Sequence, residues 1–193
     1  PFNYSAINNF GFQYASGDYY ILLNNDIEVI TPEWMEIMIG YCQREDVGIV
    51  GAKLYYPDDT VQHAGVVIGV GGFAGHILTQ MERKDVGYFG RLQAVQDISA
   101  VTAACLMIKK TVFDAVHGLD EEFEVALNDV DLCLKVRKLG KQVVFHPGVE
   151  MYHYESKSRG SESSPKKHER FKKEIARFRN KWSEILEKGD PYY

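Results

Sequence analysis

The apolar run Tyr19 to Leu23 ends on three short polar side chains, Asn24, Asn25 and Asp26. Five consecutive apolar or aromatic residues are typical of a buried strand. A turn would account for two of the polar residues, because Asn and Asp side chains bond to their own backbone. A turn does not require an acid there, however, and the carboxyl end of a strand is where open α/β sheets usually bind ligands. The run therefore favours an α/β sheet and makes Asp26 a candidate for a ligand site.

The composition is that of one globular domain. The chain has 193 residues, of which 45% are hydrophobic and 25% charged, and this length is enough to bury a sizeable core. The formal net charge of -5 does not indicate the basic surface that nucleic-acid binding requires. No apolar run approaches the roughly 18 residues that a membrane span needs. We therefore expect no nucleic-acid partner and no transmembrane segment.

The three cysteines bear on the cellular compartment. Cys42, Cys105 and Cys133 are widely spaced among apolar neighbours, without a CxxC or Cys/His pattern. Such cysteines are typical of reduced core residues in a cytosolic domain. The chain begins at Pro1 rather than Met and shows no signal-like segment. We expect this chain to be a cytoplasmic piece of a longer protein. The parent protein or its partners could hold it at the inner face of the membrane.

Helical and extended patterns alternate along the chain. Helices are expected over residues 3–15, 31–44, 111–117, 128–139 and 171–185. Strands are expected over residues 19–23, 48–55, 61–70, 99–108, 142–145 and 149–154. Asn3 or Ser5 would cap the first helix, and Thr31 the second. The first helix carries an apolar face of Ile7, Phe10 and Tyr14. The alternation favours an α/β sheet with helices on both faces.

Asp26 has two interpretations. It could simply complete the turn after the strand. It could also bind a metal ion, because a carboxylate beside amide oxygens offers the hard ligands that Mg²⁺ or Mn²⁺ prefers. Glu28 lies on the same side of an extended chain and would support that site.

The segment Asn128 to Asp131 is a second candidate. At the start of a helix Asn128 would cap, and Asp129 would lie favourably at the positive end of the helix dipole. In that position Asp129 could also take a proton from a hydroxyl group. Two residues span about 200° of a helix, so Asp129 and Asp131 cannot both face one site.

His153 ends an apolar strand just before a Ser- and Arg-containing segment. A strand histidine is more often structural, but here it could complete a carboxylate site for Mn²⁺. Arg159 could clamp a diphosphate. His63 and His76 flank the run Gly69 to Gly75 and are weaker candidates. That run does not have the spacing of a dinucleotide-binding fingerprint.

Several segments, in this order, resemble the inverting GT-A glycosyltransferases of family 2, especially the rhamnosyltransferase-like members. They are Phe2–Gly11 with Leu23–Asp26, then Val61–Gly65, Gly71–His76, Tyr88–Leu92 and Val101–Cys105, and finally Gly118–Phe123, Asn128–Leu134 and Tyr152–Gly160. The resemblance covers residues 2 to about 160. It implies a GT-A-like mixed sheet flanked by helices, which holds the metal and acceptor side of the catalytic domain.

The resemblance also implies roles for individual residues. Asp26 and His153 would bind Mn²⁺ or Mg²⁺, and Asp129 would be the general base. Asn24, Asn25 and Arg159 would lie on the donor and diphosphate side, and His76, Asn128 and Asp131 on the acceptor side. The implied reaction is inverting transfer of a hexosyl or rhamnosyl group from a UDP- or dTDP-sugar to a glycan hydroxyl, in the synthesis of cell-surface polysaccharide.

Three departures from the family pattern leave an alternative open. Asn24 replaces the first acid of the D-x-D motif, and Asn128 replaces the Glu of a Glu-Asp pair. The strand-helix-strand portion that holds the nucleotide base is missing, so the remainder of a longer chain would have to supply it. We expect residues 1–160 to form the glycosyltransferase part and residues 161–193 a charged loop and an amphipathic helix. The alternative is a non-catalytic glycan-binding or scaffold module with the same fold.

Overall fold

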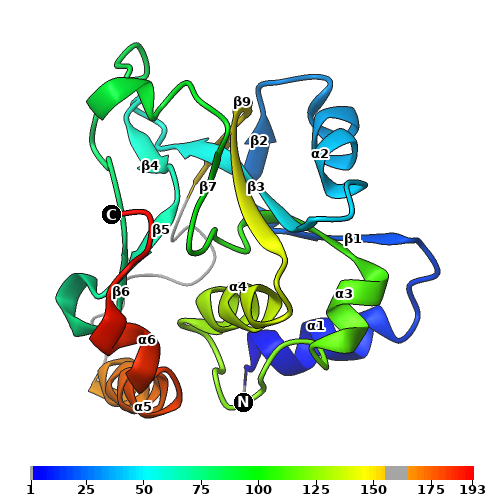
Figure 1. Ribbon diagram of the computed structural model, residues 1–193, viewed down its shortest axis with the longest axis vertical. Coiled ribbons are helices and arrows are strands. Elements are labelled where there is room, and N and C mark those ends of the chain that lie inside the picture. Colours follow the sequence, from blue (N-terminus) through cyan, green and yellow to red (C-terminus); the bar gives the residue numbers. More distant parts are fainter. Residues whose placement is uncertain (1, 155–164) are drawn as a thin grey trace.

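The computed structural model describes residues 2–154 and 165–193 (Figure 1). Seven strands form the main sheet: β1 (Tyr19–Leu23), β2 (Ile27–Val29), β3 (Val47–Tyr55), β4 (Val61–His63), β7 (Gln96–Asp97), β8 (Cys105–Lys109) and β9 (Gln142–His153). The order is β1–β8–β3–β9–β2, with β4 beside β3 and β7 beside β9. Strands β3 and β9 are parallel, whereas the other pairs are antiparallel. The predicted mixed sheet is confirmed.

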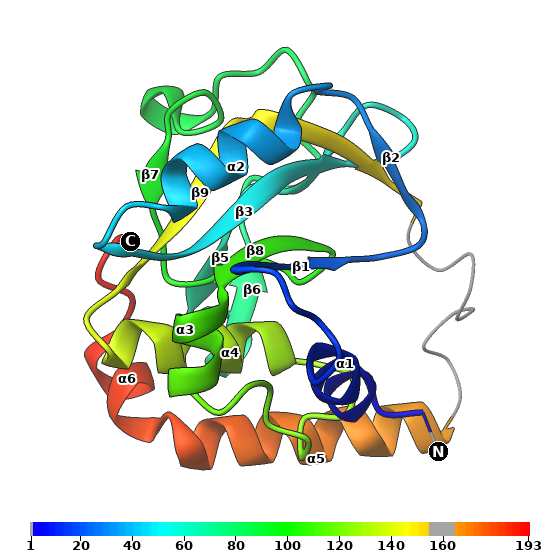
Figure 2. The same cartoon turned by 90° about the vertical axis from the view of Figure 1, so that its right-hand side faces the viewer.

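The remaining elements surround this sheet. The helices are α1 (Tyr4–Phe12), α2 (Trp34–Cys42), α3 (Lys110–Ala115), α4 (Asn128–Lys138), α5 (Pro165–Lys181) and α6 (Ser183–Lys188), with short 3₁₀ turns at Val70–Gly72 and Tyr88–Gly90. Strands β5 (Val66–Ile68) and β6 (Ala74–His76) form a separate pair. Helix α2 covers one face of the sheet, whereas α3 and α4 lie on the other, with α5 and α6 beyond α4 (Figures 1 and 2).

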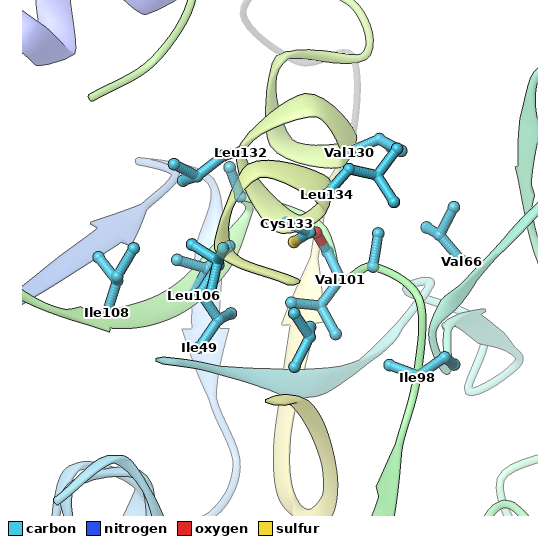
Figure 3. Packing of buried hydrophobic residues seen from close by; sticks show 14 of the residues in the cluster. Ile49, Val66, Ile98, Val101, Leu106, Ile108, Val130, Leu132, Cys133 and Leu134 are labelled. Atoms are coloured by element: carbon cyan, nitrogen blue, oxygen red, sulfur yellow. The ribbon is translucent and has the colours of Figure 1, made fainter. Parts of the chain in front are cut away.

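Each face of the sheet has its own apolar core, because side chains alternate along a strand. On β3, Val50 packs with Met38 of α2 in one core. Its neighbour Ile49 lies in the other core, with Leu106 of β8 and Leu132 of α4 (Figure 3). Full burial of one such side chain contributes about 1.5–3 kcal/mol. These cores hold β1, β8 and α4 in fixed positions.

The first predicted helix is confirmed as α1, and its apolar residues at helical spacing face outward. Ile7, Phe10 and Tyr14 are 55%, 60% and 75% exposed. The opposite, polar face points inward. Ser5 is fully buried and donates to the carbonyl of Phe123 at 2.7 Å. Burial of these polar groups is tolerated because each finds a hydrogen-bond partner.

The same polar face of α1 ties down the loop that precedes α4. Asn9 donates to the carbonyl oxygen of Leu119 at 2.9 Å and accepts from its N–H at 2.9 Å. Asn3, which was one of the two expected caps, accepts from the N–H of Ala6 at 2.9 Å. The position of α1 therefore follows from these side-chain to backbone bonds and from the packing of Tyr4 and Phe12 on the core.

Two predicted strands near the end of the sheet are one continuous strand, β9. The Pro147–Gly148 pair between them lies inside this strand. Ala52 of β3 pairs with His146 and Lys53 pairs with Glu150, so the chain between them bulges out of the ladder. Proline is tolerated at such a bulge because no ladder hydrogen bond needs its missing N–H.

The predicted caps of two helices are also wrong. Thr31 does not cap α2: its hydroxyl donates to the carbonyl of Gly148 at 3.0 Å, and Glu33 occupies the N-cap position. Asn128 is the first residue inside α4 rather than its cap. The N-cap position belongs to Leu127, whose φ of 61° lies in the left-handed region.

Three further predicted segments are shorter or divided. The stretch 61–70 forms β4 and β5, and the stretch 99–108 contributes only β8 from Cys105. The C-terminal amphipathic pattern forms α5 and α6, separated at Trp182. Phe178 and Trp182 are buried in the core beside α4, so these helices pack on their own domain. Within the described residues, no helix is long and apolar enough to cross a membrane.

Candidate active site

The turn between β1 and β2 carries Asn24, Asn25 and Asp26. Strand β1 pairs with β8, and the N–H of Asn24 donates to the carbonyl of Ala104 at 3.0 Å. Strand β2 pairs with β9, which places Ile27 opposite His153. The two pairings fix the turn at both ends and direct Asp26 toward the end of β9.

Asp26 and His153 face each other across this turn. Asp26 Oδ1 lies 3.2 Å from His153 Nε2, and both side chains are largely buried, at 14% and 11% exposure. The amide nitrogen of Asn24 lies 3.1 Å from the same Nε2. Asn25, by contrast, is exposed. The structure thus brings together Asn24, Asp26 and His153, three of the five residues that the sequence assigned to the metal and the diphosphate.

The pair Asp26 and His153 fits a divalent metal ion in part. A carboxylate oxygen and an imidazole nitrogen suit Mn²⁺, and adjacent ligands of an octahedral ion bound at about 2.1 Å lie about 3 Å apart. No group of three or more His, Cys, Asp or Glu side chains that could hold a metal lies within residues 2–154 and 165–193. Two protein ligands are nevertheless sufficient for ions that keep waters and bind substrate phosphates.

Asp129 lies in the first turn of α4, as predicted. Its Oδ1 accepts from the N–H of Val130 at 2.8 Å, and its Oδ2 accepts from the N–H of Ala103 at 3.1 Å. A carboxylate has about four lone-pair sites, so both oxygens can still accept from another donor. The two backbone bonds fix the orientation of the carboxylate.

A pocket of about 100 Å³ has Asn24 and Asp129 in its lining, whereas Asp26 and His153 lie beside Asn24 and are not among its described lining residues. Its walls include Asn24 from the metal side and Asp129 from α4, with the segment Thr102–Ala104 between them. Tyr4, Val125 and Asn128 complete the lining. Asn128 is buried and donates to the carbonyl of Val125 at 3.0 Å, which shapes the loop before α4. A wider hollow of about 490 Å³ beside α2 contains none of the predicted site residues.

Asp131 lies away from this pocket. It is fully buried, accepts from Trp182 Nε1 at 2.9 Å, and lies 2.7 Å from Lys181 Nζ. The helix geometry that separates Asp129 from Asp131 by about 200° explains why only one of them faces the pocket. The contacts of Asp131 attach the C-terminal helices to α4.

His76 is not among the described residues that line the pocket. His76 is exposed, and its Nδ1 lies 3.1 Å from Nδ1 of the buried His63. The N–H of Thr102, which lines the pocket, donates to His63 Nε2 at 3.3 Å. His63 therefore helps to hold this part of the pocket wall in place. Burial lowers the pKa of His63 well below its ordinary range, which keeps the ring neutral. Arg159 falls outside the described residues.

Sequence reasoning missed the support that Gln62 and Thr102 give to the site. Gln62 is buried, and its Oε1 lies 2.7 Å from His153 Nδ1. The signal was present, because a polar side chain inside an apolar strand pattern needs a hydrogen-bond partner. The sequence does not say which partner it finds.

The fold and the pocket at the strand ends define the class of protein: a GT-A-like glycosyltransferase fold. Solved structures that share this fold include two glycosyltransferases. One is a mannosyltransferase of Pyrobaculum calidifontis in complex with GDP-Man and Mn²⁺, with a TM-score of 0.55 and 12% identity over 81% of this chain and 37% of that one. The other is the catalytic domain of Drosophila β1,4-galactosyltransferase 7 in complex with xylobiose. Its TM-score is 0.50, and it is 15% identical over 88% of this chain and 60% of that one. These identities show a common fold alone.

The chain belongs to glycosyl transferase family 2, whose model matches residues 2–116. It is 51% identical over its full length to the protein y4gI of Sinorhizobium fredii and 40% identical to the O-antigen biosynthesis protein RfbC of Myxococcus xanthus. It spans only 21% and 15% of those proteins. A rhamnosyltransferase of Mycobacterium tuberculosis, which acts on N-acetylglucosaminyl-diphospho-decaprenol by its name, is 32% identical over 60 residues, 31% of this chain and 20% of that protein.

Proposed function

We propose that the protein transfers a hexosyl or rhamnosyl group from a nucleotide-sugar to a glycan hydroxyl, in the synthesis of cell-surface polysaccharide. One observation carries the proposal: a single pocket is lined by Asn24, beside the Asp26 and His153 pair, and by Asp129. A diphosphate leaving group and an acceptor hydroxyl need such groups on the two sides of one reaction centre. The name of the M. xanthus relative supports a role in polysaccharide synthesis.

The donor side of the reaction is proposed to lie at the turn after β1. Asp26 and His153 would hold Mn²⁺ or Mg²⁺, which would neutralise negative charge on the departing diphosphate. Asn24 and Asn25 would contact the diphosphate, and Arg159 would clamp it. The donor is proposed to be a UDP- or dTDP-sugar, and the nucleotide base would be bound by the remainder of a longer polypeptide.

The acceptor side is proposed to lie at the start of α4. The acceptor oxygen would form a bond to the anomeric carbon as the bond from that carbon to the diphosphate oxygen breaks, and the hydroxyl proton would pass to Asp129. Among the described residues that line the pocket, Asp129 is the one carboxylate. A single base suits one displacement with inversion, whereas retention through two displacements needs a nucleophile as well.

The proposal extends to the compartment. The described structure holds Cys42, Cys105 and Cys133 as free, buried thiols. Free thiols persist where the surroundings are reducing, and this supports catalysis in the cytoplasm. The exposed face of α1, formed by Ile7, Phe10 and Tyr14, is the surface where we would place further parts of a longer polypeptide, since exposed apolar patches mark contact sites.

The test uses the longest natural polypeptide that contains this chain. It is assayed with Mn²⁺ against a panel of UDP- and dTDP-sugars and glycan acceptors, with and without EDTA. We expect turnover of one donor, which EDTA and Asp26→Ala both abolish. The exposed Asp18 provides the matched control, because Asp18→Ala should leave turnover unchanged.

Two outcomes would oppose the proposal. Turnover that is insensitive to both EDTA and Asp26→Ala would remove the metal from the mechanism. Absence of turnover across the panel, with glycan binding intact, would instead favour the non-catalytic glycan-binding module.

A further inference from the structure

The strand β4 carries a buried glutamine that the proposed chemistry does not use. Gln62 is only 5% exposed, and its side chain lies against the end of β9. It makes two bonds to the same residue, His153: one to the backbone carbonyl and one to the imidazole ring. A buried amide with two bonds to one residue holds that residue in a defined orientation.

The two bonds fix which way the amide of Gln62 points. Gln62 Nε2 lies 3.2 Å from the carbonyl oxygen of His153. A carbonyl oxygen can only accept, so the NH₂ group has to be the one that faces it. Gln62 Oε1 is then the atom that lies 2.7 Å from His153 Nδ1.

The orientation of the amide in turn fixes the proton on the ring. Because Oε1 is an acceptor, His153 Nδ1 has to carry hydrogen and donate. In the neutral ring, Nε2 is then the acceptor atom. It is this atom that faces Asp26 Oδ1 at 3.2 Å and the amide nitrogen of Asn24 at 3.1 Å.

We propose that Gln62 is a positioning residue that holds His153 in the Nδ1–H tautomer and so directs the Nε2 lone pair toward the Asp26 carboxylate, where a divalent cation binds. This inference rests on the proposed function, in which Asp26 and His153 hold the metal. Histidine ligands generally donate their second ring N–H to a neighbouring acceptor, and loss of that acceptor typically costs about 10–100-fold in metal affinity.

The first measurement needs no metal. The ¹⁵N shifts of the two ring nitrogens of His153 are recorded by NMR at neutral pH in the metal-free protein, with His153→Gln used to assign the signals. We expect the Nδ1–H tautomer in the wild type, in which Gln62 Oε1 accepts from Nδ1. Gln62→Met keeps the length of the side chain but removes the acceptor, and should give a mixture of tautomers or mainly Nε2–H. Observation of mainly Nε2–H in the wild type would overturn the proposal without any variant.

The second measurement is Mn²⁺ affinity by calorimetry on the same proteins. Gln62→Met is expected to raise the dissociation constant by about 10–100-fold. Gln96 is the matched control, because its amide also bonds a backbone carbonyl, that of Arg91 at 2.7 Å, and Gln96→Met should leave Mn²⁺ affinity unchanged.

The outcomes separate the two ideas. If Gln62→Met leaves both the tautomer and the Mn²⁺ affinity unchanged, Gln62 has no positioning role, although the metal site stands. If the wild type fails to bind Mn²⁺ at all, the metal in the proposed function is refuted, and with it the purpose assigned to Gln62.

Discussion

Replacement of Asp131 by alanine should destabilise the fold strongly, although Asp131 lies only two residues from the proposed base. The carboxylate is fully buried, bonds Trp182 Nε1, and lies 2.7 Å from Lys181 Nζ and 3.7 Å from Lys135 Nζ. Removal of one partner of a buried ion pair costs about 3–5 kcal/mol. The lower end applies, because the Lys181 side chain is 31% exposed and also bonds Asp120. We therefore expect a loss of about 3 kcal/mol.

Thermal unfolding followed by circular dichroism measures this loss. For a domain of this size, 1 kcal/mol shifts Tm by about 2–4 °C, so Asp131→Ala should lower Tm by about 6–12 °C. Trp182→Phe keeps an aromatic ring but removes the N–H donor, and should cost about 1.5–3 kcal/mol. The control is Asp114→Ala, because that carboxylate is 58% exposed on α3 and should stay within about 0.5 kcal/mol of the wild type.

An Asp131→Ala protein that melts within about 2 °C of the wild type would refute the reasoning. It would mean that the C-terminal helices are not attached through this carboxylate.

Two further predictions concern the cysteines and α1. Burial raises the pKa of Cys42 to about 11 and that of Cys105 to about 12. At pH 8 only about one Cys42 in a thousand would be thiolate, so iodoacetamide should label neither cysteine until the protein unfolds. Rapid labelling of the native protein would show that these thiols are accessible. On α1, Phe10→Ser should change the free energy of unfolding by less than about 0.5 kcal/mol, because Phe10 is exposed. Phe12→Ala should cost about 2–3 kcal/mol, since Phe12 stacks on Tyr20 with ring centroids 4.4 Å apart. Equal costs would contradict the observed face of α1.

The sequence was sufficient to predict the elements that local chemistry specifies. The apolar run before Asn24 is β1, and Asp129 lies in the first turn of α4. Both predictions depend on patterns within about ten residues. The fold family and the mixed sheet followed from the order of several such segments and are confirmed.

The errors arose where a distant partner decides the local structure. The spacing of Ile7 and Phe10 indicates a helix but not which face is covered, and the loop that bonds Ser5 lies more than a hundred residues away. Thr31 would cap a helix in isolation, yet β9 supplies competing backbone partners. The link from Gln62 to His153 likewise spans 91 positions, and no local pattern can reveal it.

The central claim is that Asp129 takes the proton of the acceptor hydroxyl. The measurement that tests it most directly is the initial rate of glycosyl transfer by Asp129→Asn, relative to the wild type, at saturating donor and acceptor. The exposed control Asp114→Asn is measured beside it, and circular dichroism confirms that both variants are folded. Loss of a positioned base costs about 10²–10⁴-fold, so we predict a fall of that size in Asp129→Asn and no change in the control. Transfer by Asp129→Asn at near the wild-type rate would contradict the account.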